Sequence, residues 1–335
     1  MESLKVLYTV LEVLIAVACC LGNLMVIWAV CTCGAMRRQP TFCFIVSLAV
    51  ADFLVGAVQI PVAVLIDDRV KTSFNSCLFL SCVFMVLTQA SVHSLLAITL
   101  DRFLRVYIPL RYKSTVTQIR SWSVVGACWV SASILGFVPM FGWYRQDTLA
   151  QMEDSNSTTI TCTFLAVMPM SYLVNFTFLT CILPPMLLML VLYLCIFMRI
   201  HQQLRGGGVS GSGSHSYYHK EWSLARSLLL ILVLFAVCLL PLRFMNVASL
   251  YGPPLTVPHQ AYYVGILLLH AHSAVNPVVY ALKIHSIKSA FKTMWGRYML
   301  CKEDQETTRS SQTTGNINYI TTNRNEPNIS INISK

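Results

Sequence analysis

The residues in this chain that could do chemistry are ionisable side chains placed inside long apolar runs. A charged group away from water is costly, so such groups are kept for binding, ion pairing or switching. The set consists of Glu12, Asp52, His93, Asp101, Arg102, Arg243, His270 and His272. His93 alone is expected only to hydrogen-bond a neighbouring helix. The set holds no recognisable nucleophile–base pair or metal cluster, which favours a binding pocket with a switch over an enzyme.

Arg243 poses the sharpest question because it lies in the apolar stretch CLLPLRFMN, residues 238–246. One interpretation is snorkelling, in which the long side chain reaches water at the edge of the apolar layer. The other interpretation uses the spacing, since Arg243 and Asn246 are three residues apart and share a helix face. If that face borders a pocket, the guanidinium needs an acceptor there. That acceptor is Glu12, a ligand hydroxyl or ring nitrogen, or an anionic ligand group.

Asp52 lies in the middle of the apolar run SLAVADFLVG. A carboxyl group buried there is either neutral or bound to a cation. We expect four polar residues from other runs to share a polar core with it: Asn23, Ser91, His272 and Asn276.

A second polar group lies at the opposite ends of the runs. Asp101 and Arg102 close the third run, and Glu221 lies near the start of the sixth on the same side, where it is expected to pair with Arg102. Proline inside a helix frees a backbone carbonyl and makes a hinge. Three runs contain such a residue, at Pro185, Pro241 and Pro277. These features favour a bundle with two conformations over a rigid one.

The composition indicates a membrane protein with several spans. Hydrophobic residues make up 56% of the 335 residues and charged residues only 11%, whereas soluble chains carry about 25% charged residues. A span needs about 20 apolar residues. Seven runs meet this requirement, at roughly 7–32, 41–66, 77–104, 119–143, 171–198, 224–250 and 260–282. The sequence therefore predicts an all-α membrane protein whose seven-transmembrane-helix bundle occupies residues 1–300.

Lysine and arginine gather in the loops after the first, third, fifth and seventh runs, whereas the opposite loops are mixed or acidic. Basic loops remain in the cytoplasm, so we expect an extracellular N-terminus and a cytoplasmic C-terminus. The glycosylation sequon at Asn156 then lies in an outside loop. The net charge of +10 is spread among these short loops, which disfavours nucleic-acid binding.

The sequence also predicts a disulfide, an amphipathic helix after the last span and a disordered tail. Cys77 starts the third span and Cys162 lies in the loop before the fifth, and they are expected to form an extracellular disulfide. Residues of about 285–298 alternate basic and apolar side chains at helical spacing, which predicts an amphipathic helix on membrane lipid. Cys301 follows it as a candidate palmitoylation site. The polar tail, 301–335, is expected to be disordered.

Together these residues resemble class A, or rhodopsin-like, G-protein-coupled receptors. The motifs that carry the resemblance are GNLMV with Asn23, SLAVADFLV with Asp52, Asp101-Arg102-Phe103, Trp129, Pro185 with Tyr193, Pro241, and Asn276-Pro277-Val278-Val279-Tyr280. Each motif is weak, but the ordered set is specific. The resemblance implies that Arg102, Glu221, Tyr193, Tyr280 and the prolines act in the switch that couples to a heterotrimeric G protein.

Within that class the chain is similar to the adenosine receptors, between subtypes one and three. The local matches are SLLAITLDRFLRV, VPMFGW, TFLTCILPPMLLMLVLY, YYVGILLLHAHSAVNPVVYALKI and KEWSLARSLLLILVLFA. The resemblance implies that Phe164 stacks on adenine and that Asn246 binds its edge. It places Thr88 near the ribose and pairs Glu12 with His270. Apolar walls are implied for Met85, Leu173, Leu242 and Ile266.

Five positions depart from the family pattern. Leu239 replaces a tryptophan of the switch, and Arg243 replaces a histidine or serine. Leu269 replaces a serine or threonine beside the ribose, and His272 replaces an asparagine in the sodium-binding core around Asp52. Phe103 replaces a tyrosine. The adenine half of the site is therefore kept, whereas the ribose half and the switch are altered.

The resemblance implies a receptor at the plasma membrane for adenosine or a related purine, without a cofactor. The loop RVYIPLRYKSTVT resembles that of inhibitory-coupled members, which favours coupling to Gi over Gs, and arrestin is implied as a partner of the tail. Two alternatives stay open. One is a receptor of the same fold for a different, anionic ligand. The other is a weakly signalling membrane interaction protein, because Leu239 removes the usual switch.

Overall fold

The computed structural model describes residues 2–67, 70–154, 158–205, 212–252, 257–284 and 286–293. Asn156, Cys301 and the tail to residue 335 lie outside these ranges, as do residues 294–298 of the expected amphipathic helix. Residues 286–293 are helical. The chain divides into two compact units, Met1–Lys288 and Ser289–Lys335, and the description below concerns the first.

Seven helices in the described ranges are long and apolar enough to cross a membrane, which confirms the predicted fold class. They cover Ser3–Thr32, Pro40–Asp67, Phe74–Tyr107, Gln118–Phe141, Tyr172–Arg205, Tyr217–Tyr251 and Gln260–Lys283. Helices suit such runs because each backbone N–H and C=O is satisfied inside its own segment, where no water is available.

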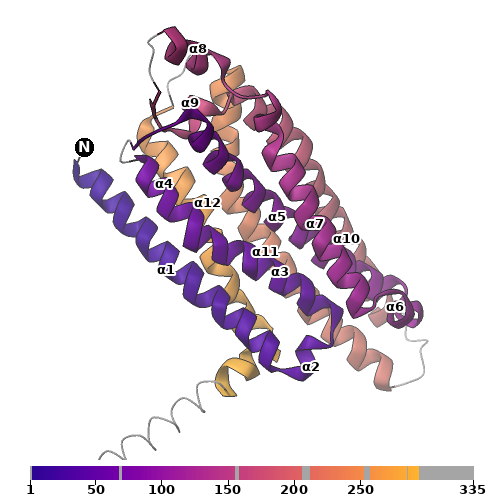
Figure 1. Cartoon of the computed structure of the whole chain (residues 1–335). Helices are drawn as coiled ribbons and strands as arrows, with labels where there is room; N and C mark the ends of the chain where they lie inside the picture. The colour runs from indigo at the N-terminus through magenta and orange to yellow at the C-terminus, as the bar shows by residue number, and fades with distance from the viewer. Residues whose placement is uncertain are drawn as a thin grey trace, which may run out of the picture. The chain divides into compact units, whose positions relative to one another are not determined.

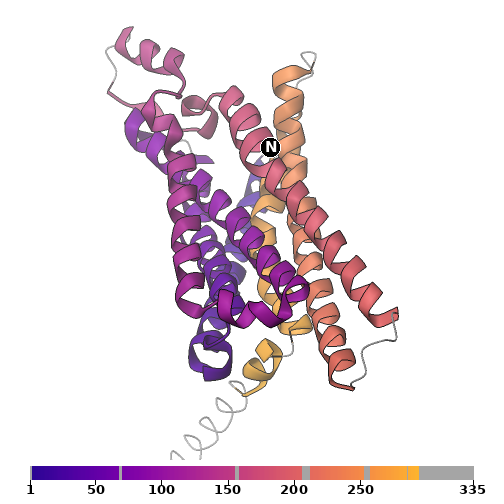
Figure 2. The ribbon, with the colours of Figure 1, turned by 90° about the vertical axis from the view of Figure 1, so that its right-hand side faces the viewer.

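The first four spans contain five α-helices, one short π-helix (η1) and one short 3-10 helix (η2). They are α1 (Glu2–Thr32), α3 (Pro40–Leu54) continued by η1 (Val55–Gln59) and α4 (Ile60–Asp67), α5 (Phe74–Tyr107), and α7 (Gln118–Phe137) with η2 (Val138–Phe141). The last three contain η3 (Tyr172–Ile182) continued by α10 (Leu183–Arg205), then α11 (Ser212–Tyr251) and α12 (His259–Lys283). Figure 1 shows the spans side by side, and Figure 2 shows them from a second direction.

Helix α5 has the most partners in the bundle, since it packs against α3, α7, α10 and α11, while α12 closes the ring between α11 and α1. The polar side chains of Asp52, Arg102 and Asn23 are buried. Large apolar residues instead lie exposed on the outer faces of α1 and α10, for example Leu14 at 61% and Leu194 at 54% exposure. This reversal of the usual order fits a bundle whose outer surface contacts lipid.

The prolines do not break the helices. Both α11 and α12 continue through Pro241 and Pro277. The fifth span changes from a π-helix to an α-helix at Leu183, directly before Pro184 and Pro185. Because proline has no N–H to donate, a wider turn before it is a common local adjustment.

Short elements join the spans at both ends. One end carries the antiparallel pair β1 (Lys71–Thr72) and β2 (Ile160–Thr161), with α8 (Gln146–Asp154) and α9 (Phe164–Val167). The end with these elements is called the disulfide end below. The opposite end carries α2 (Gly34–Arg37) and α6 (Pro109–Thr115).

Two of the departures from the sequence prediction lie at the end opposite the disulfide end. The sixth span was expected from residue 224, but α11 starts at Ser212 and so extends beyond the apolar run. No helix was expected between Pro109 and Thr115, where α6 forms with proline at its first turn. The added residues of α11 are mostly polar and lie beyond the apolar run. Helix α6 is separate from α5 and starts at Pro109, and proline is favoured at a helix start.

Candidate functional site

A cavity of about 650 Å³ lies at the disulfide end of the bundle. It is lined by all the residues predicted to contact a ligand except Glu12: Met85, Thr88, Phe164, Leu173, Leu242, Arg243, Asn246, Ile266 and His270. Leu269 also borders the cavity. These residues come from four spans and from α9, and they meet in one concave site, as ligand sites between helices of bundles commonly do.

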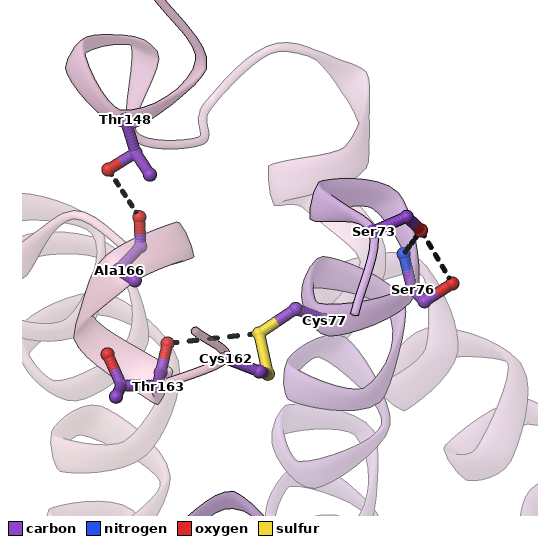
Figure 3. Close-up of a disulfide and its surroundings, with 7 residues drawn as sticks. All are labelled: Ser73, Ser76, Cys77, Thr148, Cys162, Thr163 and Ala166. Carbon is purple, nitrogen blue, oxygen red and sulfur yellow. Dashed lines mark hydrogen bonds between the residues drawn. A yellow bond between two sulfur atoms is a disulfide. The ribbon is translucent and has the colours of Figure 1, made fainter. Parts of the chain in front are cut away.

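A disulfide fixes the segment that carries Phe164. Cys77 near the start of α5 is bonded to Cys162, as predicted, and Figure 3 shows the bond beside the start of α5. The backbone N–H of Cys162 also donates to Val70 O at 2.9 Å. Phe164 follows two residues later and stacks with Phe84 at a centroid distance of 6.4 Å. The cavity thereby gains a positioned aromatic face.

Asn246 presents a side-chain amide to the same cavity. The residue is 7% exposed, and no described side chain forms a hydrogen bond with the amide. One primary amide carries both a donor and an acceptor, so it can pair with a ligand edge that offers the complementary two groups. Thr88 lines the same cavity from α5, and its hydroxyl donates to Phe84 O at 3.0 Å.

Glu12 does not line the cavity, but it pairs with His270, which does. The Glu12 carboxylate oxygens lie 2.8 and 3.0 Å from Nδ1 of His270, and both residues are buried. On the other side of the ring, Nε2 of His270 lies 3.3 Å from Nε2 of Gln59. Gln59 borders the cavity and was not predicted as a site residue. These contacts hold the His270 ring at a fixed angle and leave Glu12 unavailable to other cations.

The structure decides between the two interpretations of Arg243. The residue is 3% exposed and borders the cavity, so the side chain does not run along the outer surface to reach water. Glu12 is paired with His270 and not with Arg243. No carboxylate among the described residues lies within ion-pair distance of the guanidinium, and its Nε atom has no hydrogen-bond partner.

Asp52 has a compact set of partners in the polar core. Its Oδ1 accepts from the Ser273 hydroxyl at 2.8 Å and its Oδ2 from the Asn276 amide at 2.7 Å. Nε2 of His272 lies 3.8 Å from Oδ1. The Asn23 amide donates to Ser273 O at 3.0 Å, which joins α1 to the group. Ser273 was not among the predicted residues.

Ser91 was expected in the same core. Its hydroxyl is buried, but it has no hydrogen-bond partner among the described residues. His272 donates from Nδ1 to the Leu269 carbonyl, and its ring lies edge-on to Phe235 at 5.1 Å. The imidazole is thus held by its own helix and by α11, beside the Asp52 carboxylate.

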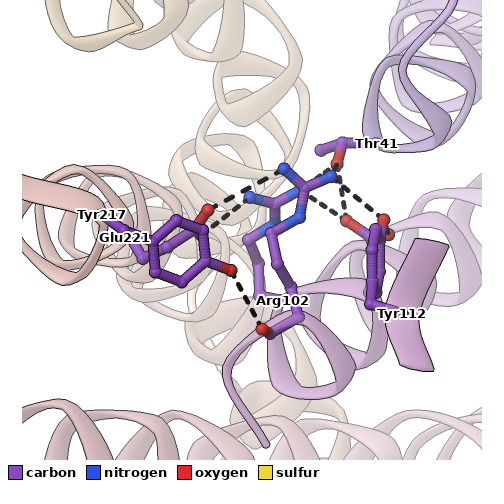
Figure 4. Close-up of polar contacts among 7 residues, drawn as sticks. Thr41, Arg102, Tyr112, Tyr217 and Glu221 are labelled. Carbon is purple, nitrogen blue, oxygen red and sulfur yellow. Dashed lines mark hydrogen bonds and ion pairs between the residues drawn. The ribbon is translucent and has the colours of Figure 1, made fainter. Parts of the chain in front are cut away.

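Arg102 is the centre of the polar cluster at the opposite end. Its guanidinium lies 2.5 Å from Asp101 Oδ2 and 3.3 Å from Glu221 Oε2, so the predicted contact between α5 and α11 is present. The Arg102 side chain is 1% exposed. Figure 4 shows it between Glu221 on one side and Thr41 with Tyr112 on the other. Removing one partner of a buried ion pair typically costs about 3–5 kcal/mol.

Three further residues complete this cluster and were not predicted. The Thr41 hydroxyl donates to Asp101 Oδ2 at 2.6 Å, and the Tyr112 hydroxyl donates to Asp101 Oδ1 at 2.5 Å. The Tyr217 hydroxyl donates to Arg105 O at 3.1 Å. Burial, and next the Asp101 carboxylate, raise the pKa of Tyr112 above its ordinary value. The phenol therefore stays protonated and available as a donor.

Two other predicted residues lie inside the bundle. Tyr193 is 2% exposed and Tyr280 is 0% exposed, and the Tyr280 hydroxyl has no hydrogen-bond partner among the described residues. Leu239 is also fully buried. His93 meets the fourth span, as expected: its Nδ1 lies 3.1 Å from the Ser131 hydroxyl.

Residues 22–280 match the family model described as the 7 transmembrane receptor (rhodopsin family). The chain is 39% identical over 308 residues to adenosine receptor A3 of Canis lupus familiaris, covering 92% of this chain and 96% of that protein. It is 39% identical over 310 residues to adenosine receptor A3 of Ovis aries, with coverage of 92% and 96%. It is 41% identical over 313 residues to adenosine receptor A2b of Canis lupus familiaris, with coverage of 91% and 94%. The chain therefore belongs to the rhodopsin-like G-protein-coupled receptors, multi-pass membrane signalling proteins rather than enzymes, and within them to the adenosine receptor family.

Proposed function

We propose that this receptor binds an extracellular purine nucleoside and passes the signal to an inhibitory G protein, which lowers cAMP. In this arrangement the N-terminus and the disulfide end face outward, and α6 faces the cytoplasm with the tail. The ligand enters the cavity through the disulfide end. The preference for Gi rests on the sequence of the loop RVYIPLRYKSTVT, and arrestin is proposed to bind the tail.

The observation that carries the proposal is the placement of the Asn246 amide and the Phe164 ring on one cavity. Adenine has a flat aromatic face and an edge on which an amino donor lies beside a ring-nitrogen acceptor. A stacked ring and a bidentate amide are complementary to those two features. Thr88 and His270 are then available to the sugar.

The Arg102–Glu221 contact is the proposed switch. A ligand activates a receptor only if it binds the active bundle better than the inactive one. A purine held between Asn246 on α11 and Phe164 pulls the outer part of α11 toward α5. Helix α11 then swings at Pro241, Glu221 leaves Arg102, and the inner end opens for the G protein. The hydroxyl of Tyr280, which has no hydrogen-bond partner in the described part of the chain, is available for a new hydrogen bond in the open bundle.

A cAMP assay tests this proposal directly. Cells expressing the receptor are stimulated with forskolin and treated with increasing adenosine, beside mock-transfected cells. A dose-dependent fall in cAMP that pertussis toxin abolishes is expected for Gi. A rise in cAMP would contradict Gi but keep the purine ligand. Full surface expression with no response to any nucleoside would favour the interaction protein that lacks a working switch.

The polar core predicts a weak effect of sodium. Sodium prefers oxygen ligands, and oxygens without partners are present at Asn23 and Ser91. However, an imidazole nitrogen of His272 lies 3.8 Å from Asp52, where an asparagine would offer an amide oxygen. The residues present therefore fit a sodium ion poorly.

We expect NaCl to change agonist affinity less than about twofold, with choline chloride as the control for ionic strength. The matched variant is His272→Asn, which restores an oxygen ligand and is expected to make agonist affinity fall as sodium rises. A strong sodium-specific fall in the unmodified receptor would contradict the role given to His272.

A further inference from the structure

The cavity contains one cation for which the described part of the chain supplies no anion. Lys5 lies at the rim and is paired with Asp67 at 3.7 Å, with both side chains partly exposed. His270 is paired with Glu12. Arg243 differs from both, because it is 3% exposed and takes part in no ion pair within the described ranges. A guanidinium cannot lose its charge as a lysine or histidine can, so the charge stays in the cavity, and among the described residues no carboxylate lies close enough to neutralise it.

We propose, on the basis of the purine-nucleoside function above, that the ligand carries an acidic oxygen group, a carboxylate or a phosphate, that binds Arg243. A guanidinium presents its N–H donors in a planar fork that matches the two oxygens of such a group. The inference deepens the proposed function by naming a charged class of nucleoside and by making this site different from one that selects neutral nucleosides.

The position of Arg243 tells which end of the nucleoside is charged. Helix α11 runs toward the disulfide end, so Arg243 lies three residues deeper than Asn246, about 4.5 Å along the axis. Thr88 lines the same cavity. Because α5 runs inward from that end, Thr88 lies deeper than Met85. A purine whose edge meets Asn246 directs its sugar toward this deeper part, so the acidic group belongs on the sugar, and the 5′ position is the one tested below.

The rest of the wall supports this assignment. Leu269 and Leu242 border the same cavity and offer no hydrogen bond to a sugar. Polar anchoring of the sugar end therefore falls to Arg243, His270, Thr88 and Gln59. Among these, only Arg243 bears a charge that no described carboxylate neutralises.

The test compares two ligands of nearly equal size on the full-length receptor in cell membranes: adenosine 5′-carboxylic acid and its uncharged 5′-carboxamide. Binding is measured for the unmodified receptor, Arg243→Gln, Arg243→Lys and Arg243→His. We expect the acid to bind the unmodified receptor at least about tenfold more tightly than the amide. Arg243→Gln reduces that preference to less than about twofold, whereas Arg243→Lys retains part of it.

Equal or weaker binding of the acid by the unmodified receptor would overturn the inference, as would an unchanged preference in Arg243→Gln. If Arg243→Gln does not reach the cell surface, Arg243→Lys against Arg243→His makes the same comparison of charged with mostly neutral side chains. AMP is the third ligand. If AMP binds the unmodified receptor more tightly than adenosine 5′-carboxylic acid does, the acidic group is assigned as a phosphate.

A second measurement keeps the inference separate from the purine proposal. If neither nucleoside binds the unmodified receptor, the purine proposal fails, and inorganic phosphate is then the probe. Phenylglyoxal modifies arginine side chains, and mass spectrometry of peptides follows Arg243 beside the exposed control Arg145. Phosphate is expected to slow modification of Arg243 at least threefold relative to chloride at equal ionic strength. Equal slowing at Arg145, or none at Arg243, would show that the cavity does not bind anions.

Discussion

Asn246→Ala is expected to abolish binding of adenosine analogues without lowering surface expression. In the unmodified receptor the amide borders the cavity, is 7% exposed and has no partner among the described side chains. Loss of the amide leaves the edge of a bound purine unpaired in a desolvated site, at about 1–3 kcal/mol for each of two hydrogen bonds. Together these losses weaken binding about 30-fold or more.

The measurement is saturation binding of a labelled analogue, with surface receptor quantified on the same cells. Phe244→Ala is the matched control, because Phe244 lies two residues away on α11 and is 58% exposed on the outer face. That variant is expected to bind like the unmodified receptor. Unchanged affinity in Asn246→Ala would refute the adenine-edge role. Parallel loss in Phe244→Ala would instead point to damage of the helix.

Cys77→Ser and Cys162→Ser are each expected to remove most ligand binding or surface expression, and each is expected to resemble the double mutant. Both residues contribute to one bond, which joins α5 to the segment two residues before Phe164. A disulfide is worth about 2–4 kcal/mol in typical proteins. Its loss here also releases the aromatic face of the cavity. Two mutations that break the same bond are not additive.

The readouts are surface expression and analogue binding for both single mutants and the double mutant. Cys31→Ser is the control, since Cys31 is an exposed free cysteine of α1. It is expected to leave both quantities unchanged. Losses that add in the double mutant would mean that the two cysteines do not act through one bond.

The sequence by itself determined the number and position of the spans. Each span depends on the length of a local apolar run, because the lipid thickness sets how many residues must be apolar and helices satisfy the backbone there. The same local logic placed Cys77 at the start of the third span and Cys162 in a loop on the same side. Where the environment changes from lipid to water, that logic no longer applies. The extension of α11 to Ser212 and the helix α6 were therefore not predicted.

The candidate site was foreseen only in part. The ligand-contact residues came from matching family motifs one by one, and the cavity gathers all of them but Glu12. Gln59, Ser273, Thr41 and Tyr112 had no such motif. Each makes its contact across helices, to residues 211, 221, 60 and 11 positions away respectively. No local pattern encodes such a contact.

The surroundings of Arg243 show most clearly what only the tertiary structure decided. The spacing to Asn246 established that the two share a face, because helical periodicity is a property of the chain. It did not establish whether that face meets lipid or the bundle interior, since rotation of α11 about its axis depends on packing against α10 and α12. The structure turns the face inward, at 3% exposure for Arg243, while Glu12 is taken by His270. Those two facts come from neighbouring helices, and together they leave the guanidinium in the cavity without a described carboxylate partner.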